Sequence, residues 1–167
     1  MDGFSIVIPV LRERNNLEKL IIRIHSSLKK INRYEVIIVD DNSNDGTKEI
    51  LIKLKKKFKK LNFIIRKNKN RDLSRSCIDG FKKAKYKFIL VMDGDLQHKP
   101  EEIYKLYTTL VNNNFDIVVG DRNLLTNKNK GLKIYRLISS ILIIFFVNIL
   151  LGFKTSDPMS GFFIFKK

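Results

Sequence analysis

The chain has 167 residues, and 44% of them are hydrophobic, so it is long enough to form one domain with a buried core. Lysine and arginine outnumber aspartate and glutamate by 33 to 17, and the formal net charge of +16 predicts an anionic partner such as a nucleotide diphosphate, an anionic lipid surface or nucleic acid. The single cysteine, Cys77, excludes an internal disulfide and is typical of a reducing compartment.

Strands and helices are predicted to alternate along the chain. An apolar strand is predicted at residues 4–9, and because the fold begins there we expect no signal peptide and a protein that stays on the cytoplasmic side. Further strands are predicted at residues 34–39, 63–65, 88–92, 115–120 and 161–165, with helical spacing of apolar residues around 17–31, 50–58, 74–83 and 103–111. This order predicts a doubly wound, mostly parallel α/β sheet with helices on both faces.

The strand at residues 88–92 ends abruptly in an acidic segment. Five apolar residues in a row are typical of a buried parallel strand, and ligands of open α/β sheets bind outside the carboxyl ends of such strands. Asp93, Asp95 and the amide oxygen of Gln97 therefore offer hard oxygen donors, which suit Mg²⁺ or Mn²⁺ holding a diphosphate. The alternative is a solvated turn, because Asp-x-Asp alone is a weak motif.

A second acidic loop, residues 40–47, follows the strand at residues 34–39 and is expected at the same edge of the sheet. Two interpretations of Asp41 stay open. Its carboxylate either accepts an N–H of a nucleotide base or belongs to a turn or helix cap. A capping role is assigned to Asp45 together with Thr47.

Three ordered motifs resemble those of family 2 glycosyltransferases of GT-A fold: residues 8–16, 39–47 and 92–98. The subgroup that they resemble is the dolichol-phosphate mannose synthase and polyprenyl-phosphate glycosyltransferase branch. Residues 156–163 are similar to that branch's Ser-Asp-x-x-Ser/Thr-Gly-Phe strand. The resemblance implies a metal-dependent, inverting hexosyltransferase that moves a sugar from GDP-mannose or a UDP-sugar to a polyprenyl or dolichyl phosphate.

The resemblance also implies which residues bind the donor. The metal and the diphosphate would be held by Asp93, Asp95 and Gln97. The nucleoside pocket would be lined by Pro9, Leu11, Glu13 and Asp41. A leucine at position 11 replaces the family's frequent tyrosine, which weakens stacking on the base.

Further implied roles concern the phosphates and the acceptor. Arg71 and Arg122 would contact phosphate, which a guanidinium binds through two parallel hydrogen bonds; the alternatives are a solvent-exposed loop arginine and a surface ion pair. Arg136 and Ser140 share one helix face and are similar to a pair that the family uses for the lipid phosphate. Asp157 would orient the sugar or the acceptor, or else act as a cap or turn residue. With Asp95 and Arg122 it completes the implied catalytic set.

Residues 137–153 carry no charge and reach the lower limit of about 17 residues for a transmembrane helix. A membrane span would separate Asp157 and the strand at 161–165 from the sheet, so we expect an interfacial helix and a peripheral contact with the cytoplasmic side of a membrane. Basic residues just before it would face anionic headgroups. The alternative is a buried or dimer-forming helix, which would make the protein a homo-oligomer.

Two other functions stay open. A saccharide or protein acceptor would need a base for its hydroxyl group, a role that falls to Asp157. A non-enzymatic basic module would bind membrane or nucleic acid, but we locate no basic and aromatic face in the sequence and expect no nucleic acid. The glycosyltransferase domain is expected to fill residues 1–167, and because family members usually continue further, we expect its C-terminal part to be missing.

Overall fold

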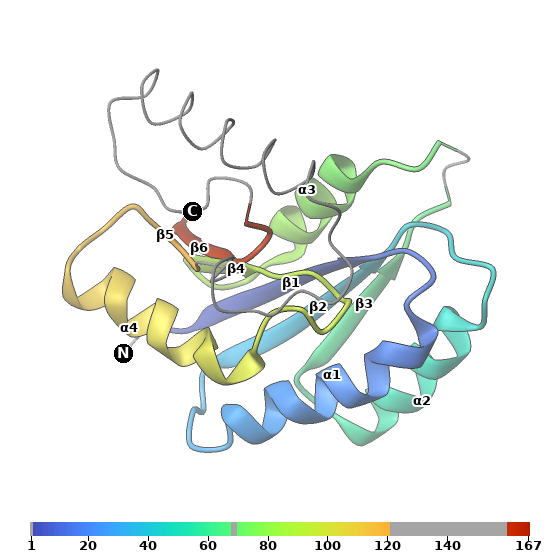
Figure 1. Cartoon of the computed structure of the whole chain (residues 1–167), viewed down its shortest axis with the longest axis horizontal. Helices are drawn as coiled ribbons and strands as arrows, with labels where there is room; N and C mark the ends of the chain where they lie inside the picture. Colours follow the sequence, from blue (N-terminus) through green and yellow to red (C-terminus); the bar gives the residue numbers. More distant parts are fainter. Residues whose placement is uncertain (1, 68–69, 121–159) are drawn as a thin grey trace, which may run out of the picture.

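The computed structural model describes residues 2–67, 70–120 and 160–167. These residues form a six-stranded sheet in the order β3-β2-β1-β4-β6-β5 (Figure 1). The strands are β1 (Phe4–Val10), β2 (Tyr34–Asp40), β3 (Leu61–Ile65), β4 (Phe88–Val91), β5 (Ile117–Val119) and β6 (Phe163–Lys166). The first four strands pair in parallel, whereas β6 runs antiparallel to β4 and β5. The predicted doubly wound, mostly parallel sheet is confirmed.

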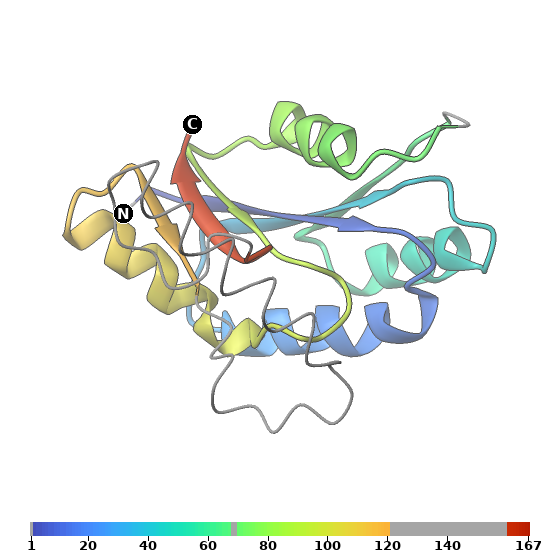
Figure 2. The same cartoon turned by 45° about the horizontal axis from the view of Figure 1, so that its top comes forward.

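Helices pack on both faces of the sheet (Figure 2). One face carries α1 (Arg14–Ser27), α2 (Thr47–Lys57) and α4 (Ile103–Asn112), which follows the short 3-10 helix η1 (Pro100–Glu102). The other face carries α3 (Leu73–Lys83).

Alternation of side chains along the strands supplies both halves of the core. In β1, Ile6 and Ile8 face the larger cluster with α1, while Val7 faces the cluster under α3. Gly80 allows the close approach of α3, because a Cβ there would lie 2.3 Å from the Cγ1 atom of Val7. The core therefore fixes how the strand ends align.

The last two strands differ from the sequence prediction in their bounds. The strand predicted at 115–120 is limited to 117–119, because the Phe115 N–H donates to the Leu110 carbonyl in the turn after α4. The strand predicted at 161–165 begins at Phe163, because the residues before it form a turn against the end of β5.

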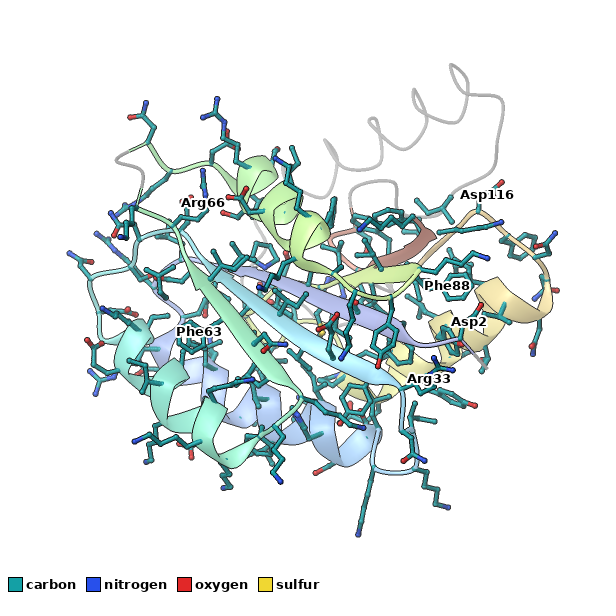
Figure 3. All side chains as sticks on the ribbon, turned by 180° about the vertical axis from the view of Figure 1, so that it is seen from behind. Asp2, Arg33, Phe63, Arg66, Phe88 and Asp116 are labelled. Carbon is teal, nitrogen blue, oxygen red and sulfur yellow. The ribbon has the colours of Figure 1, made fainter. Side chains whose placement is uncertain are left out.

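The two ends of the sheet differ in character. The parallel register brings the carboxyl ends of β1, β2 and β3 together, with Val10 beside Asp40 and Asp40 beside Ile65. Figure 3 shows Arg66 at this end and Asp2 and Arg33 at the opposite end. The loops at the carboxyl edge are the ones that the sequence predicts to be functional.

Candidate functional site

The loops that leave the carboxyl edge hold strained backbone. Arg12, Asn42 and Leu96 have φ angles of 60°, 61° and 65°, and they lie in the loops after β1, β2 and β4. A left-handed conformation is uncommon for residues other than glycine, and such strain concentrates at functional sites. Three of the four described non-glycine residues with positive φ lie in the loops of this edge, and the fourth, Asn114, lies in the turn after α4. This distribution supports a site at the carboxyl edge.

A buried ion pair joins the ends of β2 and β3. The Arg66 guanidinium donates from Nη1 to Asp41 Oδ1 over 2.5 Å, and the two side chains are only 3% and 7% exposed. The other Asp41 oxygen, Oδ2, accepts the backbone N–H of Asp72 at 2.6 Å. Arg66 also donates to the Asp72 carbonyl and lies with Nε 3.2 Å from Asp79 Oδ2. Asp41 is therefore fixed by the loop before α3.

Arg66 was missed by the sequence analysis. It directly follows β3, which is the one signal that could have pointed to it. Its partner Asp41 is 25 residues away in the chain, and the pairing depends on β2 and β3 being neighbours. The capping role predicted for Asp45 is confirmed, because its Oδ1 accepts both the N–H and the hydroxyl of Thr47.

A cleft of about 190 Å³ opens beside this ion pair. Its lining combines the end of β1, the Asp41 carboxylate and the start of α3: Pro9, Val10, Leu11, Asp41, Arg71, Asp72, Leu73 and Ser76. Four residues predicted for the donor site thus lie together, namely Pro9, Leu11, Asp41 and Arg71. Glu13 is not among the lining residues; its Oε2 accepts from Asn16 Nδ2 at 2.6 Å.

The Asp93–Gln97 loop lies on the other side of β1. Asp95 Oδ1 accepts the N–H of Gln97 at 3.0 Å, which shapes the turn. The Asp93 side chain is 42% exposed, and its Oδ2 lies 3.8 Å from His98 Nε2. Burial, and then the charge of Asp93, raise the pKa of the Cys77 thiol on α3. The thiol therefore stays protonated near neutral pH, as a small structural residue would.

The side-chain oxygens of this loop are suited to bind a hard divalent cation. Within the described part of the chain, no three His, Cys, Asp or Glu side chains gather into a group that could hold a metal ion. Asp93, Asp95 and Gln97 instead combine two carboxylates with an amide. Mg²⁺ and Mn²⁺ accept such oxygen donors, and Mg²⁺ commonly takes one or two carboxylates while keeping several waters.

Several predicted residues lie outside the described residues. They are Arg122, Arg136, Ser140, Asp157 and the apolar segment 137–153. In the ranges 2–67, 70–120 and 160–167, no helix is long and apolar enough to cross a membrane.

Comparison with protein families identifies the chain, because residues 5–167 match the model described as "Glycosyl transferase family 2". The chain belongs to this family. A dolichol-phosphate mannosyltransferase of Pyrococcus furiosus is 39% identical over 165 residues, which cover 98% of this family 2 chain and 46% of the relative. One of Saccharomyces cerevisiae is 33% identical and covers 98% of the chain, which spans 61% of that relative. The predicted resemblance to this branch is confirmed, and the chain spans only part of both relatives.

Solved structures agree on the GT-A fold. Mannosyl-3-phosphoglycerate synthase from Rubrobacter xylanophilus superposes with a TM-score of 0.74 at 16% identity, covering 99% of this chain and 53% of the other. A mannosyltransferase from Pyrobaculum calidifontis, solved with GDP-Man and Mn²⁺, gives a TM-score of 0.52 at 18% identity, covering 56% and 28%. At these identities the likeness concerns the fold alone.

Proposed function

We propose that this family 2 chain binds the nucleoside diphosphate sugar for transfer of the sugar to a polyprenyl or dolichyl phosphate. The observation that carries the proposal is the pairing of two acidic loops on either side of β1: the cleft with Asp41 and the Asp93–Gln97 loop. Sequence identity of 39% to a dolichol-phosphate mannosyltransferase supports the choice of acceptor.

The nucleoside would occupy the cleft beside Asp41. A carboxylate can accept about four hydrogen bonds, so Asp41 keeps acceptor capacity for a base N–H while Arg66 and Asp72 hold it. Pro9 and Leu11 offer an apolar wall for the base or ribose, and Arg71 is available to the phosphates at the rim.

The diphosphate would lie toward the Asp93–Gln97 loop. Asp93, Asp95 and Gln97 would hold Mg²⁺ or Mn²⁺, which when bound neutralises negative charge on the departing diphosphate. In the absence of a cation the two carboxylates would repel a diphosphate. Donor binding is therefore expected to depend on the cation.

Transfer would proceed by direct displacement with inversion. An oxygen of the acceptor phosphate forms a bond to the anomeric carbon as the bond to the nucleoside diphosphate breaks and that diphosphate leaves with the electron pair. The acceptor is mostly ionised near pH 7, since the second pKa of a phosphate monoester is about 6, and a strong general base is not needed.

The acceptor side of the proposal concerns residues outside the described part. Arg122 would stabilise the leaving diphosphate, Arg136 and Ser140 would bind the lipid phosphate, and Asp157 would orient sugar or acceptor. Residues 137–153 would contact the cytoplasmic face of a membrane as an interfacial helix.

The test is transfer of radiolabelled sugar from a panel of UDP- and GDP-sugars into an organic-extractable polyprenyl phosphate, with Mn²⁺, Mg²⁺ or EDTA. The proposal expects cation-dependent label in the lipid phase and its loss in Asp95→Ala. Nucleotide binding without lipid label would overturn the acceptor assignment in favour of a saccharide or protein. Absence of both would overturn the transferase proposal for this chain.

A further inference from the structure

A turn that precedes β6 lies directly behind Asp93. The buried Ser160 hydroxyl donates to the Gly120 carbonyl at 2.6 Å and accepts the N–H of Phe162 at 3.2 Å. The Gly120 N–H in turn donates to the Phe162 carbonyl at 2.7 Å. These hydrogen bonds fix the turn to the end of β5, so its middle residue, Gly161, is rigidly placed.

Gly161 leaves room for the Asp93 carboxylate. A Cβ atom at position 161 would lie 2.3 Å from Asp93 Oδ2 and 2.8 Å from Asp93 Cγ. Gly161 is not among the residues with positive φ, so the space it leaves, and not backbone conformation, accounts for a glycine here. The carboxylate therefore packs against the bare backbone of the turn.

His98 borders the same carboxylate on another side. The His98 ring is buried and stacks on Phe162, with 5.0 Å between ring centroids and 30° between planes. Its Nε2 lies 3.8 Å from Asp93 Oδ2, the oxygen that also meets Gly161. The turn and the histidine thus form two walls around one half-exposed carboxylate.

We propose that Gly161 and His98 are positioning residues that hold the Asp93 carboxylate in one orientation toward the donor's diphosphate and its cation. This inference rests on the proposed function, in which Asp93 is one of the residues that hold the cation of the nucleoside diphosphate sugar. A half-exposed aspartate can adopt several rotamers, and restricting them before binding reduces the entropy lost on binding. Residues that orient a metal ligand typically change metal affinity by about 10- to 100-fold when replaced.

The first variant is Gly161→Ala. Its methyl group would meet the end of a flexible side chain, so Asp93 moves and the fold is retained. We expect the Mn²⁺ affinity, measured in the presence of GDP or UDP by electron paramagnetic resonance of free Mn²⁺, to fall about tenfold with an unchanged melting temperature. The control is Gly80→Ala, whose methyl would meet Val7 in the core and should lower the melting temperature without weakening Mn²⁺ binding by the folded protein.

The second variant is His98→Phe, which keeps the stacking on Phe162 but removes the nitrogen that faces Asp93. It should weaken Mn²⁺ binding about fivefold or more at an unchanged melting temperature. The matched control is His25→Phe, because His25 is also packed among aromatic rings but lies on α1, with contacts to Tyr34 and Phe58. His98→Gln should recover part of the lost affinity.

The outcomes separate the two proposals. If the unaltered chain binds Mn²⁺ in neither the presence of GDP nor of UDP, both the proposed function and the positioning role are wrong. If the unaltered chain binds, and Gly161→Ala or a folded His98→Phe binds equally well, only the positioning role is wrong. Should Gly161→Ala fail to fold, Mn²⁺ binding by His98→Phe alone tests the positioning role.

Discussion

At the scale of single residues, the ion pair between Asp41 and Arg66 is the most consequential contact of the candidate site. Both groups are buried, and Arg66 joins Asp41 to the loop before α3 through its second contact with the Asp72 carbonyl. Burying charges is costly unless they are paired, so each partner depends on the other. The pair orders the cleft, and removing either partner should destabilise the fold, because the other charge would stay buried without it.

Arg66→Met should therefore lower the free energy of unfolding by about 3–5 kcal/mol, because it leaves the Asp41 carboxylate buried without its partner. Arg75→Met is the control, since the Arg75 ion pair with Asp72 lies in solvent and should change the free energy by about 0–1 kcal/mol. Urea denaturation measures both. Equal losses in the two variants would show that the buried pair has no special weight.

Cys77 reports on the charge of Asp93. Burial is the main cause of the raised pKa of its thiol, and the Asp93 carboxylate adds to it. Since only the thiolate reacts, alkylation at pH 8 should be slower than for a free cysteine. Asp93→Asn removes the neighbouring charge and should speed alkylation at the same pH, whereas Asp2→Asn, at the other end of the sheet (Figure 3), should not. Identical rates in all three proteins would contradict this arrangement.

Sequence patterns predicted part of the site at this scale. Asp93, Asp95 and Gln97 follow an apolar strand without interruption, so their place at the strand end could be read locally. The position of Arg66 after a strand could be read in the same way, but its pairing with Asp41, which lies 25 residues earlier, could not. The stacking of His98 on Phe162 could not be foreseen, because these residues lie more than sixty positions apart in the chain.

At the scale of elements, the last turn of α1 carries His25, whose surroundings disfavour the protonated ring. Burial lowers the pKa of His25, the hydrogen bond from its Nδ1–H to the Ile21 carbonyl opposes this, and the charge of Lys60 lowers the pKa further. The effect of burial is the largest, so the pKa of His25 is lowered, although a helix C-terminus ordinarily favours a protonated histidine. The folded chain thus prefers the neutral ring.

Stability should consequently fall as the pH drops below about 6.5, the unperturbed pKa of histidine, because the unfolded chain then binds a proton more readily than the folded one. His25→Phe abolishes this contribution, so its free energy of unfolding should decline less steeply between pH 7.5 and 5 than that of the unaltered chain. Denaturation of both proteins at several pH values measures this difference. The same dependence of the free energy of unfolding on pH in both proteins would contradict the prediction.

The junction of β5 and β6 depends on one buried hydroxyl. Ser160 donates to Gly120 and accepts from Phe162, so Ser160→Ala leaves two buried backbone groups without that partner. We expect a loss of about 1–3 kcal/mol in the free energy of unfolding, against about 0.5 kcal/mol or less for Ser74→Ala on the exposed side of α3. Thermal unfolding distinguishes them, and a neutral Ser160→Ala would mean that water replaces the hydroxyl.

Elements were predictable where the apolar pattern is strong. Four parallel strands and four helices follow from runs of apolar residues and from helical spacing. The antiparallel direction of β6 was not predictable from its own residues, because alternation has no direction. The shortening of β5 follows from a backbone hydrogen bond in the preceding turn, which no side-chain pattern records.

At the scale of the whole molecule, lysines crowd the amino edge of the sheet. Parallel topology gathers the helix C-termini at the amino edge, where lysines follow α2 and α3 and where Lys166 and Lys167 lie at the end of β6. Lys60 illustrates the crowding, because burial and the nearby Lys85 both lower its pKa. The carboxyl edge instead carries the aspartates of the candidate site together with Arg66 and Arg71.

Basic and aromatic residues meet in pairs at the amino edge. Lysines lie over four rings there: Phe58, Tyr34, Tyr86 and Phe88. Tyr34 and Phe88 are almost fully buried, so these two rings offer no platform on which bases could stack. The arrangement favours packing of lysine stems over nucleic-acid recognition.

The net charge of +16 should also make stability depend on salt. Like charges repel more strongly in the compact state, and added ions screen that repulsion. The melting temperature should therefore rise when NaCl is increased from about 0.01 to 0.3 M. A fall over this range would indicate that surface ion pairs outweigh the repulsion.

The central claim is that nucleotide binds at the carboxyl edge, between the Asp41 cleft and the Asp93–Gln97 loop. Hydrogen–deuterium exchange of the chain with Mn²⁺ and either UDP or GDP tests it most directly. We predict slower exchange in peptides covering residues 9–13, 41–46, 71–76 and 93–98, and no change in the amino-edge turns at 28–33 and 84–87. Protection confined to the lysine-rich amino edge, or none with either nucleotide, would contradict the account.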